Sequence, residues 1–351
     1  MRRTTGAVRV LLSTGLLVTA IGVVAPAAGA AESAACTWTP SILSLPAGAL
    51  TGEVHAADGS GGYAGTISYG ADSAKGGRAV LWKNGKMTDY GNIVDPEYQN
   101  WVSVDGVNKA GTVIGAADRQ NGYSRAIHSR NGKVELLPDP PGVVKSMATG
   151  INDRGDIVGG AAIDRDGALY WYAVMWPADQ PGKVVKLPGL PNLSAIATGI
   201  DQDGTVLVQV DDGLHELPYL WKGGTAHAMA LPDNTRDVIT RGISNGRVIG
   251  IADTRDKGWR NTLWESDGKP QLVERNADIR GINRDGQIVG RTDDPSWREE
   301  GVWQRTKLGS TLKWASDRGL ELNVSSDDGT IAGRSWKIPG GKDEPTVWTC
   351  R

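Results

Sequence analysis

The sequence predicts an all-β fold made of repeated four-stranded units. One pattern recurs along the chain: an alternating run ends in Gly-Ile-Asn, two turn residues and a Gly follow, and three further short runs come after them. Gly, Asn, Asp and Pro bound these runs, which is typical of strands joined by tight turns. The first turn Gly recurs every 40 to 50 residues, at Gly61, Gly111, Gly155, Gly204, Gly246, Gly286 and Gly329. A period of this length with four strands per copy is typical of propeller blades, so we expect a seven-bladed β-propeller of antiparallel four-stranded blades.

The clearest copy runs from Gly150 to Gly160, with an apolar run ending in Trp176 after it. Its Asn-x-x-Gly step supplies residues that tolerate a positive φ in a tight turn. One sheet of this size cannot bury both faces alone, so the copies must pack against one another.

Residues 1–30 are predicted to be an export signal. Arg2, Arg3 and Arg9 precede an uncharged, mostly apolar stretch from Val10 to Val24, and Ala28-Gly29-Ala30 forms a small-residue cleavage site. We favour the general secretory route over twin-arginine export, because the apolar residues expected just after Arg2-Arg3 are absent. The stretch is too short for a comfortable membrane span. Its removal deletes three Arg and no acid from a chain of net charge −2, which argues against nucleic acid or an anionic membrane as the main partner.

The mature chain has two cysteines, Cys36 and Cys350, at its opposite ends. The last copy stops one strand short, and the run 41–46 near the mature N-terminus resembles the missing fourth strand. We therefore expect the N-terminal strand to complete the last blade and a Cys36–Cys350 disulfide to lock the ring. A lipoprotein is the competing interpretation, since residues 33–36 faintly resemble a lipidation box; it would leave Cys350 without a partner.

Residues 31–351 are then expected to form one closed propeller domain. The predicted blades cover about 48–92, 100–141, 146–190, 195–233, 237–275, 277–316, and 319–350 together with 36–46. Blade 1 is the most degenerate, with the Gly-rich stretch 59–65 in place of a clean second strand. Blade 4 has Val208 where the other copies have a second Gly.

A Trp ends the third run in six copies, and we interpret these residues as structural anchors between adjacent sheets. They are Trp82, Trp176, Trp221, Trp264, Trp303 and Trp348, with His128 in the corresponding place of the second copy.

The runs Gly-Ile-Asn-x-x-Gly-x-Ile-Val-Gly and 83–91 resemble the HAF-type extracellular repeat of bacterial secreted proteins. The resemblance covers nearly all of the mature chain, although the His-Ala-Phe that names the family is absent and the matching places read Arg78-Ala79-Val80 and Tyr172-Ala173-Val174. It implies an exported, propeller-like repeat protein and brings no catalytic residues to carry over.

The sequence contains no recognisable catalytic or metal-binding motif. Its four His fall at different places in the repeat, and the acidic turns such as 201–204 lack the late bidentate acid of a calcium loop. We therefore assign no catalytic residue, metal or cofactor. Asp164-Arg165-Asp166-Gly167, in a longer loop, is the one place left open for calcium.

Aromatic residues outside the anchor position cluster at one place in the repeat. We place Trp171, Trp259, Trp297 and Trp336 in the loop between the second and third strands of their blades, with Tyr69 and Tyr123 in the same loop of blades 1 and 2, and Trp101 in an inter-blade loop. All these loops leave the blades at the same end, so one face should carry a broken ring of aromatics. These side chains either fold back over the blade edges or form an exposed platform for a sugar or a protein.

The first-strand residues Asp105, Thr149, Thr198, Arg241, Arg280 and Asn323, with His55 in blade 1, show no shared acid–base pattern. Arg241 and Arg280, in adjacent blades, are candidates for binding an anionic group. We expect a secreted, non-enzymatic binding module for an extracellular polysaccharide, cell-wall material or a protein. The alternative is a polysaccharide lyase or hydrolase acting at the central channel. The oligomeric state is left open, with a monomer expected.

Overall fold

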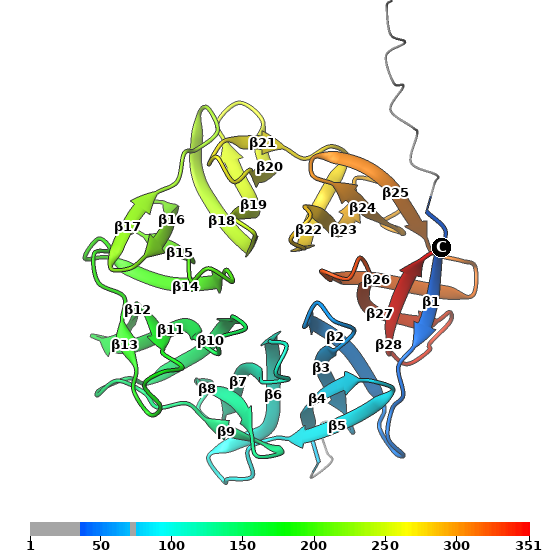
Figure 1. Ribbon diagram of the computed structural model, residues 1–351, viewed down its shortest axis with the longest axis horizontal. Coiled ribbons are helices and arrows are strands. Elements are labelled where there is room, and N and C mark those ends of the chain that lie inside the picture. The colour runs from blue at the N-terminus through cyan, green and yellow to red at the C-terminus, as the bar shows by residue number, and fades with distance from the viewer. Residues whose placement is uncertain (1–35, 71–74) are drawn as a thin grey trace, which may run out of the picture. The chain divides into compact units, whose positions relative to one another are not determined.

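Seven four-stranded antiparallel sheets surround a central axis in the computed structural model, which describes residues 36–70 and 75–351 (Figure 1). In six sheets the strands follow one another in chain order from the axis outward. The predicted seven-bladed β-propeller is therefore confirmed. The predicted export signal lies outside the described residues.

The blades are numbered in chain order. Blade 1 holds β2 (Thr51–Ala57), β3 (Tyr63–Ser68), β4 (Gly77–Lys83) and β5 (Lys86–Gly91); blade 2 holds β6 (Tyr98–Val107), β7 (Val113–Arg119), β8 (Ser124–Arg130) and β9 (Lys133–Leu136). Blade 3 holds β10 (Lys145–Ile151), β11 (Ile157–Arg165), β12 (Ala168–Trp176) and β13 (Val185–Lys186); blade 4 holds β14 (Ser194–Ile200), β15 (Val206–Asp211), β16 (Glu216–Lys222) and β17 (Thr225–Ala228). Blade 5 holds β18 (Thr235–Ser244), β19 (Arg247–Thr254), β20 (Gly258–Trp264) and β21 (Pro270–Leu272); blade 6 holds β22 (Asn276–Ile282), β23 (Gln287–Thr292), β24 (Glu299–Gln304) and β25 (Lys307–Lys313).

Blade 7 is completed by the N-terminal strand, as predicted, although the strand covers Trp38–Ile42 and not the run 41–46. It holds β26 (Arg318–Ser325), β27 (Ile331–Lys337), β28 (Glu344–Cys350) and, outermost, β1 (Trp38–Ile42). Trp38 lies opposite Cys350 in the β1–β28 ladder, and the Cys36–Cys350 disulfide joins the two strand ends with a Cα–Cα distance of 5.5 Å. The indole Nε1 of Trp38 also donates to Ser310 Oγ of blade 6 at 2.9 Å.

Blade 1 corrects one expectation, because its second strand is regular. β3 pairs along Tyr63–Ser68 with both β2 and β4. The Gly-rich residues before it form the turn instead, and the Asp58 carboxylate holds that turn by accepting from the backbone N–H of Ser60 at 2.7 Å and of Gly62 at 2.9 Å. The glycines therefore serve the turn and not a degenerate strand.

The anchor Trp residues join each blade to the one before it. Five donate their indole N–H to a carbonyl in the preceding inter-blade segment: Trp82 to Ser44 at 2.8 Å, Trp176 to Pro138 at 2.7 Å, Trp221 to Pro188 at 2.8 Å, Trp264 to Ala230 at 2.6 Å and Trp303 to Glu274 at 2.7 Å. In blade 2, His128 replaces the Trp, and the hydroxyl of Tyr90 from blade 1 instead donates to the carbonyl of Gly111 at 3.1 Å. Trp221 differs from the other five anchors, because it is only half-buried.

At every blade boundary, the turn between the first and second strands of at least one blade is bonded to the neighbouring blade. The contacts are Lys83 Nζ to Lys109 O (2.8 Å), Asn108 Nδ2 to Asn152 O (3.2 Å), Asp153 N to Gln202 Oε1 (2.9 Å), Asn245 N to Asp201 Oδ1 (3.1 Å), Asn245 Nδ2 to Arg284 O (3.2 Å), Asn283 Nδ2 to Ser326 O (2.9 Å), and the Tyr63–Thr330 hydroxyl pair (2.7 Å). Asn108 and Asn283, which stand at the Asn place of the Gly-Ile-Asn motif, supply two of these contacts through their side chains. We call this side of the propeller, which also carries the 3–4 connections, the turn face, and the opposite side the loop face.

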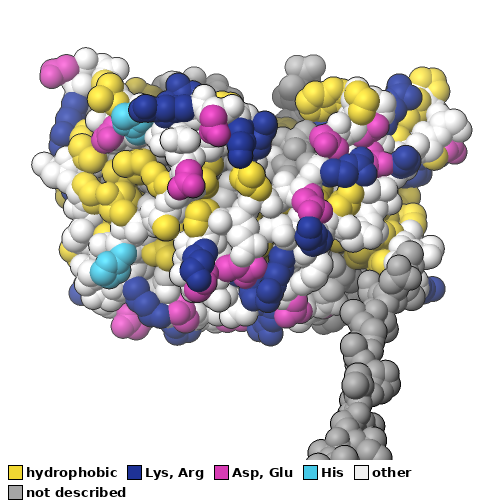
Figure 2. Space-filling view, turned by 90° about the horizontal axis from the view of Figure 1, so that it is seen from above, with side chains coloured by type: hydrophobic (Ala, Val, Ile, Leu, Met, Phe, Trp, Pro, Cys, Tyr) yellow, Lys and Arg dark blue, Asp and Glu magenta, His cyan; other side chains and the backbone are white. Residues whose placement is uncertain are grey.

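The outer edge of the propeller carries charges of both signs. In a side view, Lys and Arg alternate with Asp and Glu along the lower edge, and hydrophobic side chains gather in patches above them (Figure 2). Among the described residues, no helix is long and apolar enough to cross a membrane.

Candidate functional site

A β-bulge interrupts each of the seven inner strands at the same place in the repeat. The pairing between first and second strands skips His55, Asp105, Thr149, Thr198, Arg241, Arg280 and Asn323. These seven residues, each with the two that follow it, line a central channel with a volume of about 260 Å³. Bulges of this kind redirect a side chain and often occur beside functional sites. The fold therefore aims one side chain per blade into the channel.

The second Gly of the repeat makes room for this bulge. A Cβ on Gly65, Gly115, Gly159, Gly290 or Gly333 would overlap a backbone carbonyl oxygen of the adjoining inner strand. For Gly159, the overlapped oxygen is the carbonyl oxygen of Met147, which lies two residues before the channel residue Thr149. Backbone approach therefore favours Gly at these five positions, although blade 4 forms the same bulge opposite Val208.

Four of the seven channel side chains bond to the next blade. Thr149 Oγ1 donates to the carbonyl of Ala197 at 2.7 Å, Thr198 Oγ1 and Thr240 Oγ1 are 2.9 Å apart, Arg280 Nη1 donates to the carbonyl of Leu322 at 3.1 Å, and Asn323 Nδ2 lies 3.4 Å from the carbonyl of Val54. In each case the partner directly precedes the channel residue of the next blade. These four residues contribute to ring closure as well as lining the channel.

Asp105 and His55 are the ionisable channel residues of blades 2 and 1. Asp105 is open to solvent and accepts one weak hydrogen bond from Ser103 Oγ at 3.3 Å. The surrounding channel wall desolvates its carboxylate and raises its pKa to about 6. His55 Nε2 lies 3.1 Å from Thr66 Oγ1, and burial, supported by Arg334, lowers the pKa of the imidazole despite nearby Glu53. At neutral pH these side chains are therefore a carboxylate and a neutral imidazole.

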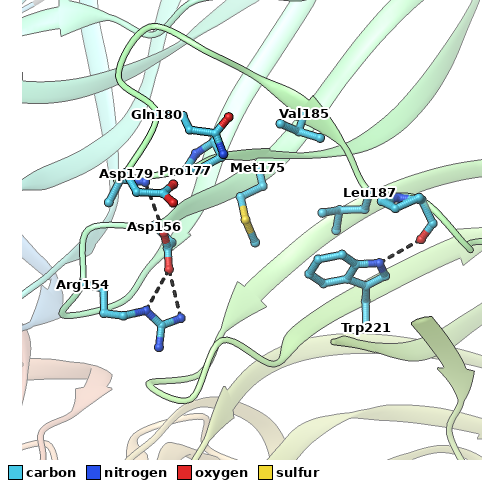
Figure 3. A pocket seen from close by; sticks show the side chains of 11 residues that line it. Arg154, Asp156, Met175, Pro177, Asp179, Gln180, Val185, Leu187 and Trp221 are labelled. Carbon is cyan, nitrogen blue, oxygen red and sulfur yellow. Dashed lines mark hydrogen bonds and ion pairs between the residues drawn. The ribbon is translucent and has the colours of Figure 1, made fainter. Parts of the chain in front are cut away.

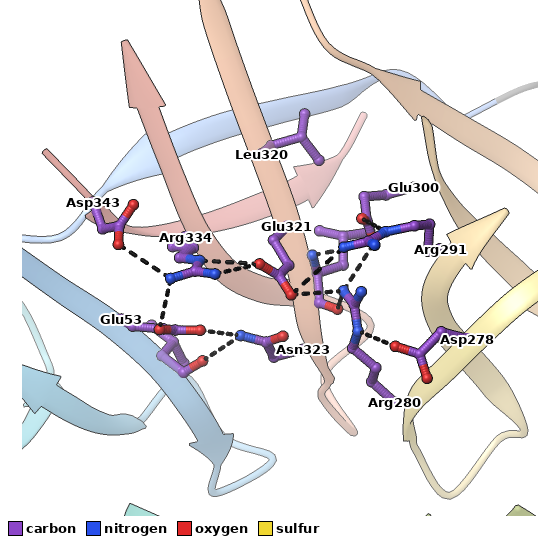
Figure 4. Close-up of polar contacts among 12 residues, drawn as sticks. Glu53, Asp278, Arg280, Arg291, Glu300, Leu320, Glu321, Asn323, Arg334 and Asp343 are labelled. Atoms are coloured by element: carbon purple, nitrogen blue, oxygen red, sulfur yellow. Dashed lines mark hydrogen bonds and ion pairs between the residues drawn. The ribbon is translucent and has the colours of Figure 1, made fainter. Parts of the chain in front are cut away.

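Arg280 is held by three carboxylates. Its guanidinium lies 2.9 Å from Asp278, 3.2 Å from Glu300 and 3.3 Å from Glu321 (Figure 4). Arg241, in contrast, has a half-exposed side chain and lies 3.9 Å from the carboxylate of Asp278. An anion shared by Arg241 and Arg280 would have to displace these carboxylates, so the structure gives no support to that pair as a binding site.

The same carboxylates extend the contacts across blades 6, 7 and 1. Arg334 Nη2 lies 2.6 Å from Glu321, and its Nη1 lies 3.1 Å from Asp343 and 3.4 Å from Glu53 (Figure 4). Asn323 Nδ2 donates to Glu53 Oε1 at 2.7 Å. We call Glu53, Asp278, Glu300, Glu321, Asp343, Arg280, Arg291, Arg334 and Asn323 the closure network. It joins the blade that closes the ring to both of its neighbours.

Glu300 is the buried acid of the closure network. Its carboxylate receives Arg280 at 3.2 Å and Arg291 at 3.5 Å. Burial nevertheless outweighs these cations and raises the pKa of Glu300 to about 7. Glu321, which Arg334 contacts closely, has a pKa below its usual value although burial opposes the shift. The sequence analysis did not predict this network, because its partners are up to 281 residues apart, from Glu53 to Arg334, and sit at different places in the repeat.

The structure corrects the location of most of the predicted aromatic residues. Trp171, Trp259 and Trp336 lie in β12, β20 and β27, and Trp101 lies near the start of β6, because the strands extend further toward the loop face than the sequence pattern indicates. Trp297, Tyr69 and Tyr123 lie in loops, as expected.

The aromatic side chains differ in exposure. Trp297 is 60% exposed, Trp259 50% and Trp101 39%. Trp171 and Trp336 are half-buried: the ring of Trp171 covers Gly160, and that of Trp336 packs edge-on against Trp314 with a centroid distance of 5.0 Å. Tyr69 and Tyr123 are also half-buried. Three of these aromatic side chains are therefore exposed, and the other four are partly covered.

Trp297 has an unusual backbone conformation. Its φ is +58°, in the left-handed region that a bulky side chain seldom adopts, and the ring lies beside the Arg291 guanidinium at 5.6 Å. Its backbone N–H donates to the carbonyl of Asp294 at 3.0 Å, which closes the turn. The loop thus holds a large, mostly exposed indole at a backbone position that Gly or Asn would suit better.

Among the described residues, no group of three or more His, Cys, Asp or Glu side chains is placed to hold a metal ion. The 164–167 turn closes by a hydrogen bond from the Gly167 N–H to Asp164 Oδ1 at 2.8 Å, which is an ordinary use of an Asp in a turn.

Comparisons with known proteins show the fold alone. No family model matches the sequence, and no curated protein matches it. Solved structures similar to this chain include puromycin hydrolase (TM-score 0.57, 11% identity, 85% of this chain and 51% of that chain), a prolyl endopeptidase (0.54, 11%, 86% and 50%) and the polysaccharide lyase Uly1 (0.52, 10%, 82% and 87%). The chain spans about half the length of the first two proteins. What these comparisons establish is that the chain shares its β-propeller architecture with proteins of several different activities.

Proposed function

We propose that the protein is a secreted, non-enzymatic binding module whose loop face binds an extracellular polysaccharide. The disulfide and the predicted export signal support a location outside the cytoplasm. The HAF-type resemblance supports the same assignment. Two adjacent blades, 5 and 6, would provide the centre of the binding surface through Trp259 and Trp297.

The observation that carries this proposal is the backbone of Trp297. A left-handed backbone at a bulky residue costs on the order of 1–3 kcal/mol, and such strain is concentrated at functional sites. The Trp297 side chain is 60% exposed, so burial of its ring does not offset the cost of the strained backbone. A binding role for the indole accounts for both features.

Polar groups beside these rings suit a sugar. Asp294 lies in the loop that carries Trp297, and Arg291 lies beside the ring. A pyranose ring has apolar C–H faces that stack on an indole and hydroxyl edges that bond to carboxylates and guanidinium groups. Binding energy concentrates in such anchors of Trp and Arg.

A depletion assay on insoluble peptidoglycan, chitin, cellulose and xylan tests the proposal. We expect the purified protein to be depleted by at least one matrix, and Trp259→Ala/Trp297→Ala to weaken that binding about tenfold or more, which corresponds to about 1.4 kcal/mol. The matched control is Leu214→Ala, which removes an 84% exposed apolar side chain from the loop face of blade 4 and should leave depletion unchanged. Depletion that persists in the double Trp variant would contradict the proposal. So would the absence of depletion on every matrix.

The second candidate is an extracellular polysaccharide-degrading enzyme acting at the channel. Asp105 favours it, because a solvent-open carboxyl with a pKa of about 6 is suited to general acid–base chemistry near neutral pH. Soluble polysaccharides would be incubated with the protein, and reducing ends or unsaturated products measured. Turnover that Asp105→Asn abolishes would favour this candidate over a binding module.

A further inference from the structure

A pocket between blades 3 and 4 lies on the turn face, away from the proposed polysaccharide surface. We propose that this pocket is a separate binding site for an uncharged sugar ring, which stacks on Trp221 and bonds to the 177–184 connection. The inference does not rest on the proposed function, because no residue of the pocket belongs to the loop-face surface.

The first step is the exposure of Trp221. The other five anchor Trp are at most 4% exposed, whereas Trp221 is half-buried. Each anchor packs back onto the outer part of the preceding blade, and the outer strand before Trp221 is β13, which has only two residues. The outer strands before the other anchors have three to seven residues. The short β13 therefore leaves part of the indole uncovered, while its N–H still donates to Pro188 O at 2.8 Å.

The second step is the composition of the pocket, which has one apolar and one polar wall (Figure 3). The apolar wall consists of Trp221, Met175, Val185 and Leu187. The polar wall consists of Arg154, Asp156, Asp179 and Gln180. Its volume of about 690 Å³ falls within the range of about 300–1,000 Å³ typical of small-molecule sites. The apolar wall matches the C–H faces of a pyranose, and the polar wall matches its hydroxyl edges.

The third step is that the polar wall is fixed in place. Asp156 accepts from Arg154 Nε at 3.1 Å and Nη2 at 3.0 Å, and also from the backbone N–H of Ala178 at 3.1 Å (Figure 3). Arg154 Nη1 donates to the carbonyl of Gln202 in blade 4 at 3.2 Å. The start of the 177–184 connection is thereby tied to the core of the turn face. Donors and acceptors that are already positioned lose little freedom when a ligand binds.

The fourth step is the charge of the pocket, which selects among sugars. Asp156 and Asp179 outnumber the single cation Arg154 in the lining. Burial opposes ionisation of Asp156, but hydrogen bonds from Asn152, the backbone N–H of Ala178 and Arg154 lower its pKa, so it is ionised at neutral pH. A uronate carboxylate would add a third negative charge at this site. The ligand is therefore a neutral sugar, such as a hexose, a pentose or an N-acetylated hexosamine.

Isothermal titration with cellobiose, N,N′-diacetylchitobiose, xylobiose and maltose tests the inference, with digalacturonate as the charged counterpart. We expect at least one neutral disaccharide to bind and digalacturonate to bind more weakly. Trp221→Leu should weaken binding about tenfold. Asp179→Ala should also weaken it, and because Asp179 is an exposed loop residue this variant keeps the fold intact. Asp267→Ala, an exposed Asp in the corresponding 3–4 connection of blade 5, is the matched control and should bind as the unmodified protein does.

Trp259→Ala/Trp297→Ala separates this inference from the proposed function, since disaccharide binding at the blade 3–4 pocket should survive in that variant. Conversely, Asp179→Ala should leave depletion by polysaccharides unchanged. The inference is overturned if none of the four neutral disaccharides binds, if digalacturonate binds most tightly, or if neither Trp221→Leu nor Asp179→Ala weakens binding. A loss confined to Trp221→Leu would also overturn it, because the polar wall would then have no part in recognition.

Discussion

The disulfide between Cys36 and Cys350 should contribute a large part of the stability of the ring. The perturbation is Cys36→Ser/Cys350→Ser, which removes the covalent link and leaves the five-residue β1–β28 ladder in place. The two cysteines are 314 residues apart in sequence. A cross-link that closes a loop of this length lowers the entropy of the unfolded chain by an amount equivalent to about 6 kcal/mol at 25 °C, which is an upper figure.

The native contacts of β1 determine what the double variant retains. Trp38 stays bonded to Ser310, and Leu43 N–H donates to the carbonyl of Pro345 at 2.8 Å, so the strand is still held at both ends. We therefore expect the folded ring to persist and the free energy of unfolding to fall by about 3–6 kcal/mol. Most domains are stable by about 5–15 kcal/mol, so a loss of this size is readily measured.

Urea unfolding, followed by Trp fluorescence, measures the effect. The unmodified protein in reductant should reproduce the midpoint of the double Ser variant, which serves as an internal control. The slope of free energy against urea should rise in the variant, because an open unfolded chain exposes more surface. Equal midpoints with and without the disulfide would refute the chain-entropy reasoning and show that the β1–β28 ladder alone closes the ring.

Three further predictions follow from individual residues. Trp297→Asn should leave stability unchanged or raise it by up to about 1 kcal/mol, because Asn tolerates a left-handed backbone. The same variant should weaken polysaccharide binding. A fall in its thermal midpoint would show that the indole is a packing residue. Gly159→Ala should destabilise the protein by about 2 kcal/mol or more in the same urea assay, since the new Cβ would overlap Met147 O. The control is Gly309→Ala, whose Cβ would lie 3.5 Å from Val302 O and which should change stability by less than about 0.5–1 kcal/mol. The pKa of Glu300 is raised from 4.5 to about 7 in the folded state, so folding favours the protonated form and stability is lost as the pH rises between those values. The stability of the unmodified protein relative to Glu300→Gln should therefore fall by up to about 3 kcal/mol from pH 4.5 to 7. A stability difference that stays constant over this pH range would contradict the prediction.

The repeat made the fold predictable because each of its parts has a geometric task. The Asn of the Gly-Ile-Asn turn bonds to the next turn, the second Gly admits a carbonyl oxygen, and the Trp reaches the preceding blade. These tasks recur once per blade, so their sequence signal is repeated and the number of blades can be counted. The missing strand of the last copy likewise predicts closure by the N-terminal strand, which the β1–β28 ladder confirms.

The candidate sites were less predictable, because they depend on features that do not repeat. The period places Trp171 and Trp336 at the loop-face end, but it does not indicate that Gly160 and Trp314 lie against their rings. The closure network joins Glu53 to Arg334, which occupy different strands of different blades. The exposure of Trp221 depends on the length of β13, and the sequence pattern of blade 3 gives no sign that this strand has only two residues. Strand length and side-chain partners are set by tertiary packing, which a single copy of the repeat does not encode.

The bulges explain why the channel can differ in chemistry from blade to blade while the fold stays constant. The second-strand residue opposite the bulge is Val208 in blade 4 and Gly in the other six blades. The channel residues, in contrast, include acid, base, hydroxyl, amide and guanidinium groups. Since the ladder pairing skips the channel residue, substitutions at the channel position alter the lining without breaking the ladder. Asp105 bonds only weakly within its own strand, and Thr149 in the next blade closes the ring through Ala197. A residue such as Asp105 can therefore be exchanged at little cost to the ring, whereas exchanging Thr149 or Asn323 removes an inter-blade contact. Variation in function at the channel is then expected first at the positions of Asp105, His55 and Arg241.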